Sequence, residues 1–394
     1  MDFTVSKRAV EKAQAVRAFI ERHLHPIELN YPHTFRLEPE FRQRLRERAM
    51  AEGLWALHMP ASLGGGGLSL LEICAVYEEM AQVSIGQDVF GSHAPDAPNM
   101  VLLDGLGTDA QKDKYLTGLM QGTLSSCIAM TEPDAAGSDP RTIQTVATRT
   151  DAGWSITGRK WLVGGAMDAD FYVVMAKTDS DAITAFLVDR ETAGVKPIRH
   201  VPDMHADDCE DEVAFEHCSV SDDAVLGRPG DGFAAGQQRL AFARLTHAMR
   251  WVGMAVRCQR LAIEHAAADR RSMGRRLGEH GQVQAMIADN AVDIHASRLI
   301  VLNAAWNADR GADMRHLASI TKLHSSEMLG RVADRSLQIL GGRGYTCDTP
   351  LEKIYRTARA GRIYDGPSEI HRYVIARNLL KGHTRHDPGL AVEP

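Results

Sequence analysis

The stretch Gln338-Ile-Leu-Gly341-Gly342-Arg-Gly344-Tyr345 begins with helix-forming residues and then places three glycines close together. A helix C-cap commonly takes one glycine in a left-handed conformation, but a cap does not account for three. Farther along lies a second turn, Tyr364-Asp365-Gly366-Pro367-Ser368-Glu369, in which Asp-Gly-Pro is typical of a turn that leads into a helix. Both turns are therefore predicted to interrupt a helical C-terminal region.

A third segment lies before the middle of the chain, Ala129-Met130-Thr131-Glu132-Pro133-Asp134-Ala135-Ala136-Gly137-Ser138-Asp139. Together, in this order and at this spacing, the three segments resemble the signatures of the acyl-CoA dehydrogenase family. The Asp-Gly-Pro turn and His93-Ala-Pro-Asp96 are most similar to the branch of members ten and eleven. The resemblance covers nearly the whole chain, from Leu68 to Arg377.

Composition along the chain predicts three regions. Residues 230–394 contain a long proline-free stretch with apolar side chains at helical steps, which predicts packed helices and a loose tail at 384–394. Residues 125–229 contain short β-branched runs between turns, which predicts a small antiparallel β domain. Residues 1–124 return to helical periodicity. The expected strands include 146–150, 154–157, 171–175 and 183–188. This order matches the fold that the resemblance implies: a mainly α protein with an N-terminal helical domain, a central β-barrel or sandwich, and a C-terminal four-helix bundle.

The Asp-Gly-Pro turn carries the expected catalytic base. Taken alone, Asp365 is typical of a turn or a helix cap, but the resemblance implies a carboxylate here that removes the substrate α-proton. Such a weakly acidic proton requires a positioned base and stabilisation of the enolate oxygen. Most of the family has Glu at this position, and Asp is shorter by one methylene. Some members carry the base on an earlier helix, just before an Arg that faces CoA, but here Ala243 precedes Arg244. Asp365 is therefore the candidate at a known position.

The resemblance implies further contacts with substrate and with FAD. The expected substrate-binding residues are Arg244, at the CoA end, with Ser138, Tyr364 and Gly366. The expected FAD contacts from the β domain are Met130, Thr131, Gly137, Ser138, Trp161 and Gly164. Those from the C-terminal region are Arg270, Met273, Gln338, Gly341, Gly342 and Pro367. Of these, Arg270, Gln338, Gly341 and Gly342 would hold the FAD pyrophosphate and adenosine across a dimer interface. His371 is a pocket-lining candidate, and Arg250 is interpreted as a helix-surface arginine, with the polar end of an acyl chain or CoA as the alternative.

One segment departs from the family pattern. Where the family has Trp-Ile-Thr or Trp-Ile-Ser, with Trp against the flavin, a position-for-position match places Leu162 and Gly164. Trp161 is adjacent, but a shift of one residue along a strand turns a side chain to the other face. Trp161 can take the flavin position only if the strand contains a β-bulge.

The bulk properties limit the partners. A chain of 394 residues predicts two or three domains, and a formal charge of −6 with a pI near 6.3 argues against a nucleic-acid or membrane-surface protein. No apolar run approaches the roughly 20 residues that cross a bilayer, and no secretory signal is expected, so a cytoplasmic location is predicted. The six cysteines are scattered without Cys-x-x-Cys pairs, which indicates free thiols and no metal site.

The resemblance implies an enzyme of fatty acid metabolism that dehydrogenates an acyl-CoA, or an acyl group on acyl carrier protein, at the α,β position. FAD would accept the β-hydride, and an electron-transferring flavoprotein would then accept the electrons. A homotetramer, built as a dimer of dimers, is implied because each FAD is completed by a neighbouring subunit. Two alternatives remain: an oxygen-using flavoenzyme on the same fold, such as an acyl-CoA oxidase or a monooxygenase, and a non-catalytic binding subunit.

Overall fold

The computed structural model describes residues 4–30, 37–178, 182–204 and 210–381, so the tail expected at 384–394 lies outside the described residues. The chain forms two compact units. The first consists of Met1–His58, Gly66–Phe90 and Ala243–Pro394, and the second of Met59–Gly65 and Gly91–Phe242. The division into three domains at residues 124 and 229 stays a prediction.

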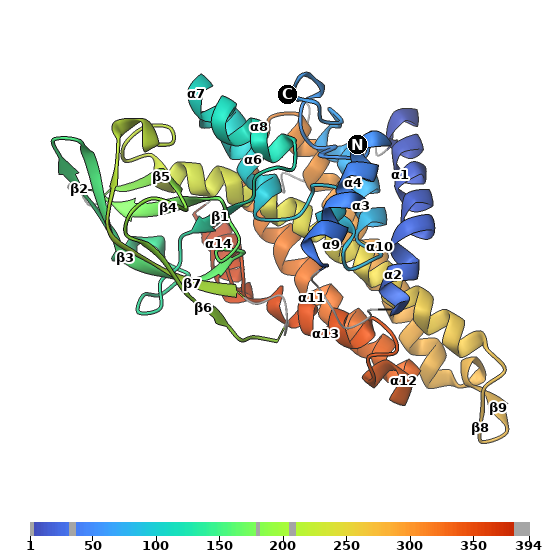
Figure 1. The fold of residues 1–394 in the computed structure, drawn as a ribbon. Helices are drawn as coiled ribbons and strands as arrows, with labels where there is room; N and C mark the ends of the chain where they lie inside the picture. Colours follow the sequence, from blue (N-terminus) through green and yellow to red (C-terminus); the bar gives the residue numbers. More distant parts are fainter. Residues whose placement is uncertain (1–3, 31–36, 179–181, 205–209, 382–394) are drawn as a thin grey trace. The chain divides into compact units, whose positions relative to one another are not determined.

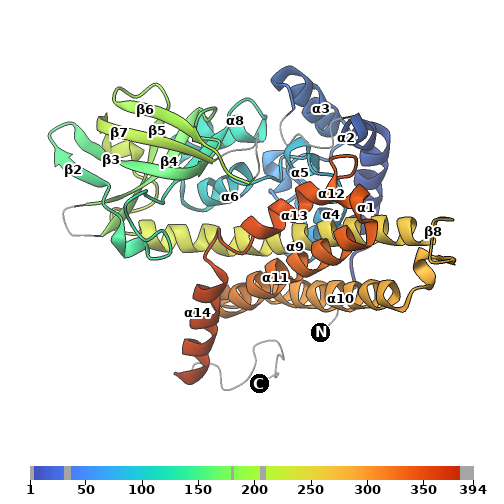
Figure 2. The same cartoon turned by 90° about the horizontal axis from the view of Figure 1, so that it is seen from below.

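The first unit is helical. Its N-terminal helices are α1 (Lys7–Phe19), continued by a π-helical turn (Ile20–Leu24), α2 (His25–Asn30), α3 (Pro39–Ala51), α4 (Leu70–Met80) and α5 (Gly86–Val89). Its C-terminal helices are α9 (Gly232–Ala267, from Ala243 onward), α10 (Gly281–Asp309), α11 (Met314–Leu340), α12 (Gly342–Tyr345), α13 (Leu351–Ala360) and α14 (Ser368–Leu380). A short hairpin, β8 (Arg271–Ser272) and β9 (Arg275–Arg276), lies between α9 and α10. Helices α10 and α11 run side by side, and α13 and α14 pack against α11 (Figures 1 and 2).

Local sequence accounts for the start of one central helix and for one close helix contact. Helix α4 begins with a capping box, in which Ser69 and Glu72 exchange side-chain and backbone hydrogen bonds. Helix α9 approaches α4 at Gly253, where an added Cβ would lie 2.3 Å from the carbonyl oxygen of Glu78. A glycine is required at that crossing. Trp251, two residues earlier, is fully buried in the helical core.

The second unit combines a sheet with the helices α6 (Asp96–Leu106), α7 (Asp109–Gln111) and α8 (Thr117–Met120). The strands are β1 (Ser126–Ala129), β2 (Val146–Thr150), β3 (Gly153–Gly164), β4 (Phe171–Lys177), β5 (Ile183–Asp189), β6 (Val195–Val201) and β7 (Glu210–Val220). Their order is β1-β4-β2-β3-β7-β6, with β5 paired to β4. The expected antiparallel pairing holds for β2–β3, β3–β7, β4–β5 and β6–β7, whereas β1–β4 and β2–β4 are parallel.

The pairing of β3 with β7 shifts by one residue beside Trp161. Trp161 lies opposite Glu212 and Val163 lies opposite Asp211, so Leu162 is the extra residue of a β-bulge. Leu162 has a φ of +51° and is exposed, as a residue that leaves the regular ladder can be. The mainly α fold with a central, curved β sheet is confirmed (Figure 1). No helix in the described ranges is both long and apolar enough to cross a bilayer.

Candidate functional site

The candidate base lies in a tight turn between α13 and α14. Asp365 has a φ of +55° and Gly366 a φ of +95°, so two consecutive residues adopt left-handed conformations. Asp tolerates this region better than most side chains, and Gly adopts it at no steric cost. Pro367 is the N-cap of α14, whose first helical residue is Ser368. The backbone geometry of the turn therefore explains why Asp, Gly and Pro follow one another here. The turn also fixes the backbone position of the Asp365 carboxylate.

Three side chains from three helices hold the backbone of this turn. The carbonyl oxygen of Asp365 accepts hydrogen bonds from Arg244 Nε at 2.9 Å and from His371 Nε2 at 3.2 Å. The carbonyl oxygen of Gly366 accepts one from Lys322 Nζ at 2.6 Å. Burial lowers the pKa of His371 to about 4, so the ring is neutral at pH 7, and Nε2 must carry its proton to donate to a carbonyl.

Burial also lowers the pKa of the two cations that hold this turn, Lys322 and Arg244. It lowers the pKa of Lys322 to about 8, although the charge of Asp365 opposes the shift. It lowers the pKa of Arg244 as well, and an arginine remains charged in any case. The predicted contact of Arg244 with the CoA end of the substrate stays a prediction. In the structure, its Nε donates a hydrogen bond to the turn that carries Asp365.

The carboxylate of Asp365 is bonded to a histidine that the sequence reading did not single out. Asp365 Oδ2 lies 2.8 Å from Nδ1 of His247, and the two side chains are 16% and 11% exposed. A carboxylate only accepts, so His247 Nδ1 is the donor when Asp365 is ionised. The His247 ring is stacked on Trp251, with centroids 5.9 Å apart, and meets Tyr364 edge-on at 5.3 Å. The ring is therefore fixed on both sides.

The spacing on α9 was the available signal for His247. It lies three residues after Arg244 and four before Trp251, so the three share one face of the helix. Tyr364, a predicted pocket residue, lies against this face, and burial raises the pKa of its hydroxyl. Arg250 also lies on this side and contacts Gln87 and Tyr364, so the helix-surface interpretation is wrong. A surface position was predicted for Arg250 because the charge pattern alone does not reveal what packs over a helix.

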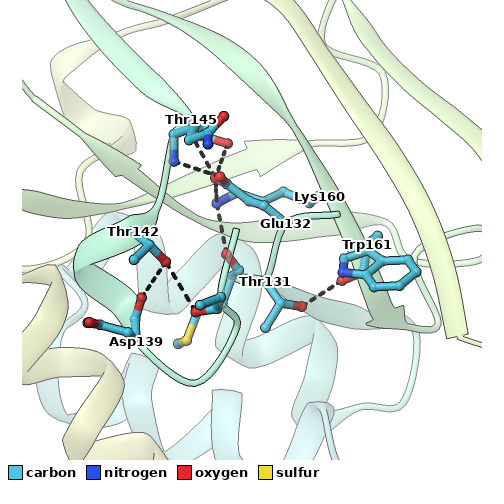
Figure 3. Close-up of polar contacts among 10 residues, drawn as sticks. Thr131, Glu132, Asp139, Thr142, Thr145, Lys160 and Trp161 are labelled. Atoms are coloured by element: carbon cyan, nitrogen blue, oxygen red, sulfur yellow. Dashed lines mark hydrogen bonds and ion pairs between the residues drawn. The ribbon is translucent and has the colours of Figure 1, made fainter. Parts of the chain in front are cut away.

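In the second unit, the predicted flavin contacts Thr131 and Trp161 are joined directly (Figure 3). Thr131 Oγ1 donates to the carbonyl oxygen of Trp161 at 2.6 Å, and Trp161 N donates to the carbonyl oxygen of Thr131 at 3.1 Å. The bulge at Leu162 places Trp161 and Gly164 opposite Glu212 and Glu210 of β7, two residues apart, and so on the same face. The bulge that the sequence required for Trp161 is present, and it recovers the family spacing.

The other second-unit candidates surround this pair. Met130 is half-buried, and Gly137 and Ser138 lie in an exposed loop. A Cβ added to Gly137 would lie 3.2 Å from Thr131 Cγ2, so the loop runs close to the strand. An exposed loop beside a half-buried Trp161 fits the edge of a bound planar ring. The residues present therefore fit the flavin end of FAD.

A buried ion pair lies next to this segment and stabilises it. Lys160 Nζ lies 2.8 Å from Glu132 Oε1 and donates to the carbonyl oxygen of Met130 at 2.9 Å (Figure 3). Thr145 donates to the same carboxylate through its backbone N–H and its hydroxyl. Burial lowers the pKa of Lys160 to about 8. Burial alone would raise the pKa of Glu132, but the Lys160 charge and the hydrogen bonds outweigh it, and the pKa is lowered.

The candidates for the FAD pyrophosphate and adenosine lie on exposed parts of the first unit. Met273, at the tip of the β8–β9 hairpin, is 96% exposed with a φ of +50°, and Gln338 is exposed near the end of α11. Gly341 has a φ of +58°, and nothing lies within 4 Å of a Cβ added to it or to Gly342.

The charge of Arg270 and that of Arg343, which lies in the glycine turn, both act on His265. The pKa of His265 is lowered by burial and then by the charges of Arg270 and Arg343. Guanidinium groups such as those of Arg270 and Arg343 suit a pyrophosphate. No group of His, Cys, Asp or Glu within the described ranges could hold a metal ion.

Comparison with known proteins places this geometry in a family. Models of the acyl-CoA dehydrogenase N-terminal, middle and C-terminal domains match residues 7–123, 127–218 and 230–380. The (R)-benzylsuccinyl-CoA dehydrogenase of Thauera aromatica is 33% identical, over 99% of this chain and 100% of its own length. Acyl-CoA dehydrogenase family member 11 of Rattus norvegicus is 31% identical, over 97% of this chain and 52% of that protein. The structure of butyryl-CoA dehydrogenase from Megasphaera elsdenii matches with a TM-score of 0.87 at 27% identity, over 96% of this chain and 100% of the other.

These matches confirm the family and the similarity to the branch of members ten and eleven. They also confirm the cofactor and the enzyme class. The individual contacts to FAD and substrate stay predictions. The chain belongs to the acyl-CoA dehydrogenase family, and it is an FAD-dependent oxidoreductase that acts on CH–CH groups.

Proposed function

We propose that this enzyme introduces an α,β double bond into an acyl-CoA thioester, with Asp365 as the base. The observation that carries the proposal is the way Asp365 is held. Its backbone is fixed by Arg244 and His371, and its carboxylate is hydrogen-bonded at 2.8 Å to His247. A general base must be positioned within hydrogen-bond reach of the proton that it removes, and these contacts restrain Asp365 at both its backbone and its carboxylate.

His247 acts in this proposal as a positioning residue. It binds Oδ2 and thereby directs Oδ1 of Asp365 toward the substrate, because the two oxygens of a carboxylate point in different directions. This matters because Asp is shorter than the Glu of most relatives, and a misplacement of about 1 Å can cost about 100-fold in rate. A short base that is held in one rotamer therefore loses less catalytic rate than a short base that is free to rotate.

The reaction then requires two transfers from the acyl chain. The α-proton goes to the Asp365 carboxylate, and the β-carbon loses a hydride as the double bond forms. Bound FAD supplies the acceptor for that hydride. Thr131, Trp161, Gly137 and Ser138 would hold the flavin end of one FAD. Arg270, Gln338, Gly341 and Gly342 would hold the pyrophosphate and adenosine of the FAD of a neighbouring subunit, across a dimer interface.

The bulge in β3 weakens one reason for the two alternatives. An oxygen-using flavoenzyme or a non-catalytic subunit was suggested by the missing flavin-facing Trp and hydroxyl at Leu162 and Gly164, and a non-catalytic subunit also by the shorter base. With the bulge at Leu162, Trp161 lies on the same face as Gly164, although Gly164 supplies no hydroxyl. An electron-transferring flavoprotein as acceptor and an assembly of two dimers complete the proposal by family analogy.

The test is anaerobic titration of the FAD-loaded enzyme with a panel of acyl-CoA thioesters while the visible flavin spectrum is recorded. One or more members should bleach the flavin. Asp365→Asn should keep FAD but abolish bleaching. Asp365→Glu should bleach more slowly, because a longer side chain at a φ of +55° is less well tolerated. Asp348→Asn, at an exposed position, is the matched control. Unchanged bleaching by Asp365→Asn would remove Asp365 from the role of base.

A further inference from the structure

The helical first unit contains a cavity between α4, α9 and α10. Its volume is about 130 Å³, and the segment just before α1 also contributes to its lining. All of these segments belong to the same compact unit. The apolar side chains that line the cavity, among the described residues, are those of Val5, Ala75, Met249, Val252, Val301 and Leu302.

The cavity lies on the side of α9 that is turned away from the candidate base. Met249 and Val252 follow His247 by two and by five residues. At 3.6 residues per turn, their side chains leave the helix about 160° and about 140° away from that of His247. A substrate that reaches Asp365 on the His247 side therefore does not occupy this cavity.

The polar groups at the wall of the cavity already have partners. Arg298 donates to the carboxylate of Glu78 through Nε at 2.8 Å and through Nη2 at 2.6 Å. The Cys74 thiol donates to the carbonyl oxygen of Leu70 at 3.3 Å, and burial raises its pKa well above the usual value, so it stays neutral. A buried water molecule needs two to four polar partners. Within the residues that the structure describes, this lining offers few, and it favours an uncharged apolar molecule.

Size and lining chemistry together indicate which molecule fits. In another protein, an apolar cavity of about 150 Å³ stays dry and binds benzene or xenon. Two of the lining side chains, Cys74 and Met249, carry sulfur, and the thioether of Met makes favourable contacts with aromatic rings. We propose that this cavity is a binding site for a small, uncharged aromatic molecule of the size of one benzene ring. The site is additional to the dehydrogenase reaction and does not depend on it.

The experiment is thermal unfolding of the FAD-loaded full chain, followed by circular dichroism, in a series of benzene concentrations. A ligand that binds only the folded state raises Tm progressively with its concentration. Benzene should therefore raise Tm. Phenol has the same ring and a hydroxyl that would be buried without a partner, so it should bind about 5- to 150-fold more weakly.

Two substitutions in the lining assign the effect to this cavity. Ala75→Leu fills part of the volume and should abolish the benzene shift. Val301→Leu adds a single carbon and should weaken the shift, and it keeps the test valid if Ala75→Leu does not fold. Ala51→Leu makes the same change at an exposed position at the end of α3, and as the matched control it should keep the wild-type shift.

Crystals of the FAD-loaded protein under xenon pressure locate the site directly, with a xenon peak expected beside Met249 and Val252. The proposal is overturned if benzene leaves the Tm of the wild type unchanged, or if both lining variants keep the full shift. Phenol that binds as tightly as benzene, or xenon found only elsewhere, also contradicts it. If benzene binds only after residues 1–3 are deleted, the chain's own N-terminus occupies the cavity and the proposed ligand is wrong.

Discussion

Replacement of His247 tests whether a short base depends on its hydrogen-bond partner. In His247→Leu the carboxylate of Asp365 loses the donor now 2.8 Å from Oδ2, while its backbone clamp to Arg244 and His371 remains. A hydrogen bond to a charged group is worth about 1.5–3 kcal/mol, which corresponds to about 10- to 150-fold in rate if it is fully expressed in the transition state. We therefore expect flavin reduction to slow within that range, with FAD retained.

The assay is anaerobic stopped-flow reduction with a thioester that bleaches the wild-type enzyme, repeated across pH. His247→Asn separates positioning from packing, because its amide N–H can approach the place of Nδ1 without a titrating ring. This variant should recover much of the lost rate. The pH profile should also change in His247→Leu, because a carboxylate that loses a donor binds its proton more tightly.

The cations near the base, Arg244 and Lys322, are unchanged in His247→Leu. A changed pH profile of flavin reduction therefore reports the loss of the His247–Asp365 hydrogen bond. His295→Asn, an exposed histidine on α10, is the control and should behave as wild type. If His247→Leu reduces its flavin at the wild-type rate with an unchanged pH profile, then His247 does not position the base.

Two further predictions concern stability. Lys160→Met should lower the free energy of unfolding by about 3–5 kcal/mol in urea titrations, because it leaves buried Glu132 unpaired, whereas Lys196→Met at an exposed ion pair should cost under about 1 kcal/mol; equal costs would contradict the buried-pair argument. His371 has its pKa lowered to about 4, so it contributes stability above its unfolded pKa of 6.5 that is lost as pH falls toward 4, and His371→Gln should flatten this decline; parallel wild-type and variant curves would exclude His371 as the titrating group.

Much of the fold could be predicted because its signals are local. The expected strand at 146–150 coincides with β2, and those at 154–157, 171–175 and 183–188 lie within β3, β4 and β5. Strands β6 and β7 were not among the expected strands. Polar and charged residues interrupt the alternation there, including Pro197 in β6 and the acidic start of β7 at Glu210.

The site was predictable only where neighbours in sequence are also neighbours in space. The Asp-Gly-Pro turn predicted the position of Asp365. Its partners are distant in sequence: His247 is 118 residues from Asp365, and Lys322 is 44 residues from Gly366. The spacing on α9 marks His247 as a neighbour of Arg244 on one helix face, but it does not identify the distant carboxylate that His247 binds. The environment of Arg250 was misjudged for the same reason, since Gln87 lies 163 residues before it.

The bulge at Leu162 has a consequence for comparing relatives. A strand that absorbs one extra residue locally keeps every side chain beyond that residue on its proper face. If Trp161 takes the place of the flavin-facing Trp, as proposed, the gap between this chain and relatives with a regular Trp-Ile-Thr strand belongs at Leu162, with Trp161 aligned to Trp and Gly164 to Thr. An ungapped alignment pairs Leu162 with that Trp and scores a substitution where the structure has an insertion.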